Sequence, residues 1–172
     1  MLKVNGLTGF GQAGGDPSYD GPLVVTNTAT NVVDALNSQF HNHLSMSFGT
    51  ADTNRWIVVT IAAQDSDNTK GCYITGVTIG GETATLYRTR NFDGSSRTLM
   101  TTIAVAKVET GTTGTVSIIY NVATAESAIS VYRVIASTTA DLTSSHADGT
   151  DSVNGSAQLS VSVDCPAGGA IF

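Results

Sequence analysis

The longest apolar run in the chain covers residues 54–63 and is the clearest signal of secondary structure. Its two alternate faces are both apolar, with Trp56, Val58 and Ala62 on one face and Ile57, Val59, Ile61 and Ala63 on the other. A half-exposed strand alternates, whereas a strand covered on both sides does not. The β-branched residues and the flanking turn residues favour a strand over a buried helix. The pattern therefore predicts a central sheet strand here.

The preceding stretch, residues 40–48, does alternate. Its apolar positions are Phe40, Leu44, Met46 and Phe48, and the polar positions between them are His41, His43, Ser45 and Ser47. This is the pattern of a half-buried strand. We expect the apolar set to face the core and both histidines to lie on a solvent-exposed face.

Short apolar segments and turns recur at regular spacing along the rest of the chain. The predicted strands cover residues 23–26, 73–79, 83–88, 99–107, 115–120, 128–135 and 159–163. The pair Gly80-Gly81 is suited to a tight hairpin turn. A loose helical spacing over 31–36 leaves room for a single short helix. Strands at this spacing predict an all-β antiparallel β-sandwich, of the jelly-roll or Ig-like kind, over residues 23–172.

Residues 1–22 are rich in glycine, whose ordering costs more backbone entropy than that of any other residue. They predict an extended N-terminal arm that becomes ordered only against a neighbour, although a frayed terminus explains the composition as well. At the other end, residues 165–172 have the pattern of a turn followed by a strand that has only begun. We therefore expect the sandwich to lack its last strand, and the natural chain to continue.

Composition narrows the classes of partner. Of the 172 residues, 41% are hydrophobic and 13% are charged, about half the usual charged share. The net charge is -6 and the basic residues are scattered, which disfavours nucleic-acid binding. The N-terminus has no apolar run suited to a signal peptide and no segment is long enough to cross a bilayer, so we expect cytoplasmic synthesis and no membrane partner. That compartment favours free thiols at Cys72 and Cys165 over a disulfide.

Few residues form patterns that carry chemistry. His41 and His43, two apart on one strand, could hold a transition metal with a third ligand, but surface histidines are the favoured interpretation. The loops Asp65–Asn68 and Asp148–Asp151 offer oxygen ligands for calcium, yet their residues are ordinary turn formers. No Gly-x-Ser-x-Gly elbow is present. We expect no catalytic, metal or cofactor-binding residues, and no enzyme.

The order of features over residues 48–135 resembles a β-sandwich module of tailed-bacteriophage and prophage structural proteins, found in tail, neck, spike, fibre and head-decoration components. The matching motifs are Phe48-Gly49-Thr50-Ala51-Asp52, Ile74-Thr75-Gly76-Val77-Thr78-Ile79-Gly80-Gly81, Ile103-Ala104-Val105-Ala106, Gly111-Thr112-Thr113-Gly114-Thr115-Val116-Ser117-Ile118 and Val131-Tyr132-Arg133-Val134. The resemblance implies a non-enzymatic structural subunit, located in the virion. It would form a symmetric homo-oligomer, a trimer or larger, and contact other virion proteins.

A carbohydrate- or host-surface-binding module of a phage receptor-binding protein is the alternative. Sugar platforms usually need exposed aromatic side chains. The single tryptophan, Trp56, lies in the predicted central strand and is expected to be buried. The aromatic residues left to contact a sugar are therefore Tyr19, Tyr73, Tyr87 and Tyr120. A host surface glycan is the partner that this alternative predicts.

Overall fold

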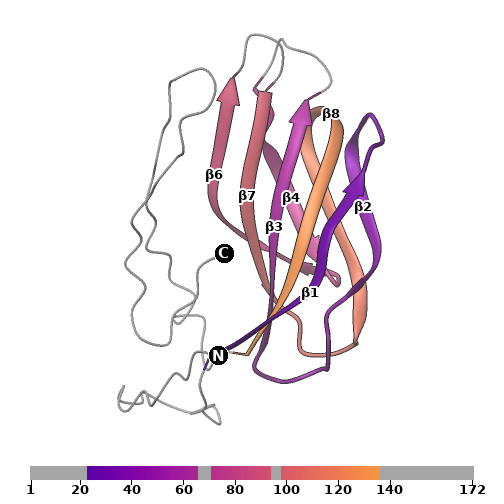
Figure 1. Cartoon of the computed structure of the whole chain (residues 1–172), viewed down its shortest axis with the longest axis vertical. Helices are drawn as coiled ribbons and strands as arrows, with labels where there is room; N and C mark the ends of the chain where they lie inside the picture. The colour runs from indigo at the N-terminus through magenta and orange to yellow at the C-terminus, as the bar shows by residue number, and fades with distance from the viewer. Residues whose placement is uncertain (1–22, 66–70, 94–97, 136–172) are drawn as a thin grey trace.

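A computed structural model describes residues 23–65, 71–93 and 98–135, and these contain eight strands and no helix. The strands are β1 (Val24–Asp34), β2 (Ser38–Ser47), β3 (Arg55–Asp65), β4 (Ile74–Ile79), β5 (Glu82–Thr83), β6 (Thr85–Asp93), β7 (Thr98–Lys107) and β8 (Thr113–Ile135) (Figure 1). All of their pairings are antiparallel, and they join into one sheet that is nearly closed into a barrel. The all-β, antiparallel prediction is confirmed.

The 23-residue strand β8 organises the sheet. Its C-terminal half pairs with β1 on one side and β3 on the other, and its N-terminal half pairs with β2 and β4. The prediction of two separate strands here, at 115–120 and 128–135, is wrong. No glycine or proline interrupts residues 115–135, so the chain stays extended through the polar stretch between the two apolar segments.

The prediction of a central strand is confirmed by β3, which lies between β7 and β8. Its odd-numbered residues Ile57, Val59 and Ile61 belong to the main core, together with residues of β4, β7 and both halves of β8. Its even-numbered residues Trp56 and Val58 form a second, smaller cluster on the other face. Ala62 on that second face is exposed, so the face is covered over only part of its length.

The short helix considered for residues 31–36 is not formed, because β1 continues to Asp34. The strand prediction at 23–26 is confirmed by the start of β1. Irregularities in the pairing with β8 lie between Asn27 and Ala29 and between Ala29 and Val32, and Asn31 has a φ of 51°. Such bulges shift which residues face the core, and this shift broke the strict alternation that would have indicated a strand.

The hairpin turn at Gly80-Gly81 is confirmed. Its two glycines have φ values of 62° and 94°, and Ile79 pairs with Glu82 across it. Positive φ at both central positions is the tight hairpin conformation that glycine adopts without strain. The predicted strand at 83–88 divides at Ala84, whose N–H donates to the Val77 carbonyl, so β5 ends and β6 begins there.

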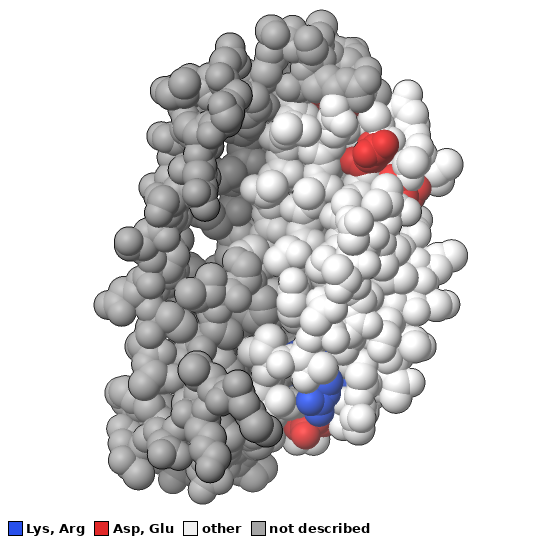
Figure 2. Space-filling model, in the orientation of Figure 1, with Lys and Arg blue, Asp and Glu red and all other residues white. Residues whose placement is uncertain are grey.

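The two separate sheets of a sandwich are not confirmed, since hydrogen bonds connect all eight strands into one sheet. The predicted arm at 1–22, the predicted strand at 159–163 and the turn at 165–172 lie outside the described residues. The described side chains on the face in Figure 2 carry few charges, as the composition predicts. No described helix is long and apolar enough to cross a membrane.

Candidate functional site

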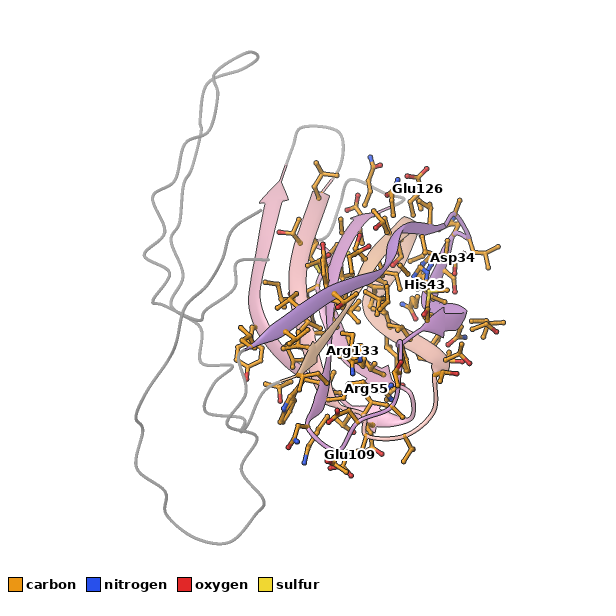
Figure 3. All side chains as sticks on the ribbon, turned by 60° about the horizontal axis from the view of Figure 1, so that its bottom comes forward. Asp34, His43, Arg55, Glu109, Glu126 and Arg133 are labelled. Atoms are coloured by element: carbon orange, nitrogen blue, oxygen red, sulfur yellow. The ribbon has the colours of Figure 1, made fainter. Side chains whose placement is uncertain are left out.

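Six polar side chains of the described residues gather at the bend where β8 passes from one half of the sheet to the other. Asp34 ends β1, His41 and His43 come from β2, and Tyr120, Thr124 and Ser127 come from β8. Figure 3 shows Asp34 and His43 close together at this end of the molecule. We call these six residues the bend cluster.

The prediction that His41 and His43 lie on a solvent-exposed face is wrong. His41 is 0% exposed and His43 is 3% exposed, whereas Phe40 and Leu44 are 58% and 66% exposed. Met46 and Phe48 do pack in the main core, as predicted, after the irregularity between His43 and Met46, where Ser45 has a φ of 55°. Before that irregularity, β2 presents the opposite face to the core. The reason is that β2 meets the polar bend of β8, where buried oxygen atoms are available to the imidazole nitrogens.

His41 is surrounded by oxygen atoms. Its Nδ1 lies 3.1 Å from Asp34 Oδ2, an ion-pair distance whose angle is too poor for a hydrogen bond. Its Nε2 lies 2.6 Å from Thr124 Oγ1 and 3.0 Å from the Ser38 carbonyl oxygen. The ring also packs edge-on against Tyr120, with centroids 5.5 Å apart. These contacts hold the imidazole in one orientation.

The order Asp34, His41, Thr124 follows the sequence of contacts in nucleophilic triads, in which a carboxylate orients a histidine and the histidine activates a hydroxyl. A triad also needs a path for the substrate to the hydroxyl. Thr124 is 0% exposed and its hydroxyl also lies 3.3 Å from the Ser38 carbonyl oxygen. A substrate therefore has no access to the Thr124 hydroxyl, and the bend cluster acts as a buried polar connection between β1, β2 and β8.

Ser127 joins the second half of the cluster. Its Oγ lies 2.8 Å from the Tyr120 hydroxyl and 3.4 Å from His43 Nε2. Burial lowers the pKa of His43; the Asp34 carboxylate opposes this shift, and His41 adds to it. Burial also raises the pKa of the Tyr120 hydroxyl. The inner part of the cluster therefore favours the neutral forms of both groups.

The metal and calcium candidates are not brought together. Among the described residues, no three His, Cys, Asp or Glu side chains are grouped to hold a metal ion. Asp65 is buried, and its Oδ1 accepts a hydrogen bond from the Thr98 N–H at 3.0 Å. The rest of the first loop, residues 66–68, and the second loop, Asp148–Asp151, lie outside the described residues.

Cys72 is a free thiol, as predicted, and it is fully buried, while Cys165 lies outside the described residues. Burial, and then the nearby Asp65 carboxylate, raise the pKa of Cys72 to about 11. A protonated, inaccessible thiol is a poor nucleophile and a poor metal ligand. Its role is to fill space in the main core.

Sequence reasoning missed Arg55, which is 0% exposed. Its guanidinium donates hydrogen bonds to four backbone carbonyl oxygens, those of Val108 at 2.6 Å, Thr110 at 2.6 Å, Gly49 at 3.0 Å and Phe48 at 3.4 Å. Desolvation and the nearby Arg133 lower the pKa of Arg55, and Asp52 opposes this. Arg55 thus joins two loops at the opposite end of the sheet from the bend cluster (Figure 3). Its position within the longest apolar run, residues 54–63, was the signal available in the sequence.

The outer side of β2, β4 and the N-terminal half of β8 carries exposed apolar residues. Phe40 pairs directly with Ile119, and these are 58% and 40% exposed. Gly76 pairs with Ile119 from the other side and has no side chain to cover it. Leu44 is 66% exposed, and Tyr73 beside β4 is 50% exposed. We call Phe40, Leu44, Tyr73 and Ile119 the apolar patch.

The tyrosines considered for sugar binding are separated by the fold. Tyr73 is exposed, Tyr87 packs partly buried against the smaller cluster with Trp56, and Tyr120 is buried. Tyr19 lies outside the described residues. One exposed tyrosine therefore remains of the predicted set among the residues that the structure describes.

Fold and side chains together define an all-β protein built on one antiparallel sheet, with a buried polar connection and an exposed apolar patch. Comparison of the chain with protein-family models, with curated proteins and with solved structures finds no match. The function is therefore argued from the residues themselves.

Proposed function

We propose that this chain is a non-enzymatic structural subunit of a bacteriophage virion, which forms a symmetric homo-oligomer and contacts other virion proteins. The observation that carries the proposal is the apolar patch. Phe40 and Ile119 are direct cross-strand neighbours and both are exposed, and exposed apolar side chains that adjoin one another mark interaction surfaces more often than isolated ones do. The proposal that the particle is a bacteriophage virion rests on the resemblance of residues 48–135 to the phage module.

The surroundings of the patch suit contact with another copy of the chain. Strand β2 has no charged residue between Ser38 and Ser47, so a second copy meets no like charge there. Among the described strands it pairs with β8 alone, and its ladder with β8 is interrupted between His43 and Met46, where Ser45 has a φ of 55°. Bulged edges resist strand addition. The contact that this geometry favours is between side-chain faces.

Two further parts of the proposal depend on residues outside the described ranges. The first is that residues 23–172 together form a sandwich of the jelly-roll or Ig-like kind. The second is that residues 1–22 dock onto another subunit. The arm has apolar groups to bury at Leu2, Val4, Leu7 and Phe10, set among glycines that favour disorder in the free chain. A chain that starts at Leu23 should then fold and fail to enter particles.

The patch is tested by a double substitution, Phe40→Ser with Leu44→Ser. Both residues are exposed, so the monomer should melt at an unchanged temperature, while sedimentation velocity should show loss of the oligomer and purified particles should lack the variant. The matched control is Gln39→Ser with Asn42→Ser, two exposed polar residues of the same strand. An unchanged oligomer in the first variant would remove the patch from the proposal.

A carbohydrate-binding role is the second candidate, and the exposure of Tyr73 is the observation in its favour. Asn121 holds the backbone of this residue on both sides, with its Oδ1 2.7 Å from the Tyr73 N–H and its own N–H 3.0 Å from the Tyr73 carbonyl oxygen. These bonds fix the backbone of Tyr73, and its exposed aromatic ring offers an apolar face to a sugar ring. Glycan-array binding that disappears in Tyr73→Ala and persists in Thr75→Ala would favour this role over assembly.

A further inference from the structure

One side of the sheet points away from the main core. On this side the pairing of β3 with β8 and with β7 places one residue of each strand in a row, and we call the side formed by these rows the outer face. The rows are Val134-Trp56-Lys107, Tyr132-Val58-Val105, Ser130-Thr60-Ile103 and Ala128-Ala62-Thr101. The first two rows are mostly large and apolar, and the last two are mostly small or hydroxyl-bearing.

The first two rows resemble an interior. Trp56, Val58, Val105 and Val134 are 9%, 1%, 6% and 1% exposed. Within the described part of the chain, the partly buried apolar side chains that pack against them are Leu23, Tyr87, Ile103 and Tyr132. Apart from Leu23, these residues belong to the same sheet layer. A sheet face this apolar normally packs against a second layer about 10 Å away.

The last two rows form a shallow hollow of about 490 Å³ beside the buried rows. Thr60, Ala62, Thr101, Ala128 and Ser130 contribute to its lining, and no charged residue does. Tyr132 and Ile103, which pack against the buried cluster, also line the hollow, so the hollow adjoins that cluster. Apolar side chains from another segment can enter it without leaving a charge unpaired.

We propose that the C-terminal segment of the same chain, residues 136–172, lies over the outer face and places residues 159–163 against it as a strand. The described part of β8 ends at Ile135, and Val134 belongs to the buried cluster, so the segment begins next to this face. This inference concerns the completion of the fold and does not depend on the function proposed above.

The sequence of the segment matches the face. Leu159, Val161 and Val163 alternate with Ser160 and Ser162, the pattern of a strand with one dry side and one wet side. Residues two apart on a strand repeat at about 6.6 Å, which is also the spacing of successive rows of the outer face. Three apolar side chains can therefore meet three consecutive rows.

The N-terminal arm is a weaker occupant for the same face, although Leu23 shows that it too begins nearby. Glycines at 6, 9, 11, 14 and 15 interrupt its apolar positions and raise the entropy lost on ordering. The arm has no run of alternating residues like 159–163. The closing experiment includes it as an outcome.

The test uses the full chain, whose single tryptophan, Trp56, is an energy donor within the outer face. An acceptor dye is attached to Cys165 near neutral pH. Cys72 stays unlabelled because it is buried and its pKa is about 11, and a Cys165→Ser chain verifies this. We expect strong quenching of Trp56 that does not change on dilution. If residues 136–172 were detached, they could reach tens of ångströms away and quenching would be weak.

Two substitutions localise the contact. Val161→Asp should abolish the energy transfer and shift Trp56 emission to the red, whereas Ser160→Asp should change neither. The labelled natural sequence gives an answer even if Val161→Asp does not fold. Weak transfer in that chain overturns the proposal. A mixing experiment tests for a second copy: Trp56→Phe chains that carry the dye are mixed with unlabelled chains that keep Trp56. Energy transfer in this mixture means that the dye-bearing segment covers the face of another copy, and it also overturns the proposal. A red shift in Phe10→Asp with none in Val161→Asp assigns it to the arm.

Discussion

Replacement of Arg55 by methionine is the most informative perturbation of this fold. Methionine keeps a long apolar stem in the same space, and it removes the guanidinium that donates to the carbonyl oxygens of Phe48, Gly49, Val108 and Thr110. The change therefore separates the hydrogen bonds of Arg55 from its packing. These bonds hold the loop before β3 against the loop after β7.

Two opposing contributions set the size of the effect. Hydrogen bonds from a charged donor contribute about 1.5–3 kcal/mol each, and three of the four here are 3.0 Å or shorter. Burial of the guanidinium costs several kcal/mol, which the lowered pKa of Arg55 reflects. The carbonyl oxygen of Val108 stays buried without its donor in the variant, whereas exposed Thr110 can bind water. We expect a net loss of about 3 kcal/mol in the free energy of unfolding.

The assay is urea unfolding followed by the fluorescence of the neighbouring Trp56. Arg133→Met is the matched control, because Arg133 donates from Nε to a single carbonyl oxygen, that of Thr50 at 2.9 Å, and should cost less than about 1 kcal/mol. Arg55→Lys should resemble Arg55→Met, since one ammonium cannot reach four fixed carbonyl oxygens. Equal midpoints for Arg55→Met and Arg133→Met would refute the assignment of Arg55 as the connection between the loops.

Three further changes test other parts of the structure. Burial lowers the pKa of His43 below its ordinary value of 6.5, so the unfolded chain binds a proton at this residue before the folded chain does as the pH falls. The free energy of unfolding should therefore be at its full value above pH 6.5 and decline below it. Urea unfolding at a series of pH values should show a smaller decline in His43→Gln. Ile61→Asp places a carboxylate in the main core and should prevent folding, whereas Leu44→Asp on the exposed side of β2 should leave the melting temperature nearly unchanged; a folded Ile61→Asp chain would mean that the core is misassigned. Gly114→Ala brings a methyl group into the Phe48 ring and should cost about 1–3 kcal/mol by calorimetry, while Gly71→Ala, with open space around it, is the control; equal costs would exclude the overlap as the cause.

Strand β2 shows where the alternating pattern stops being informative. The pattern correctly indicates a strand, and Met46 and Phe48 pack in the main core as predicted, but before the irregularity at Ser45 the histidines and not Phe40 and Leu44 face inward. Orientation depends on what the facing strand offers, and the partners of His41 and His43 come from β8, more than eighty residues later. No local pattern contains that information. A strand read as amphipathic can thus be assigned the wrong buried face when polar groups have buried partners.

The central strand and the glycine turn were predictable for a different reason. Residues 56–59 are apolar on both faces, so either orientation buries them, and Gly80-Gly81 specifies its turn through backbone conformation alone. The continuity of β8 and the bend cluster were not predictable, because each depends on several strands meeting at one place. Arg55 belongs with them, since its four partners lie in two loops that only the fold brings together.

The bend cluster gives a physical reason why one strand can serve both halves of the sheet. At residues 120–127 the partners of β8 change, from β2 and β4 to β1 and β3, and the registers with β2, β3 and β4 shift at or next to this stretch. The backbone pairing of β8 is therefore irregular here. Side chains supply the missing connections there: Thr124 contacts His41 on β2, and His41 lies against Asp34 on β1. Because these contacts are buried, each is stronger than it would be in water and each is costly to break. The polar residues that separate the two apolar segments of β8 thus fix the position of its bend.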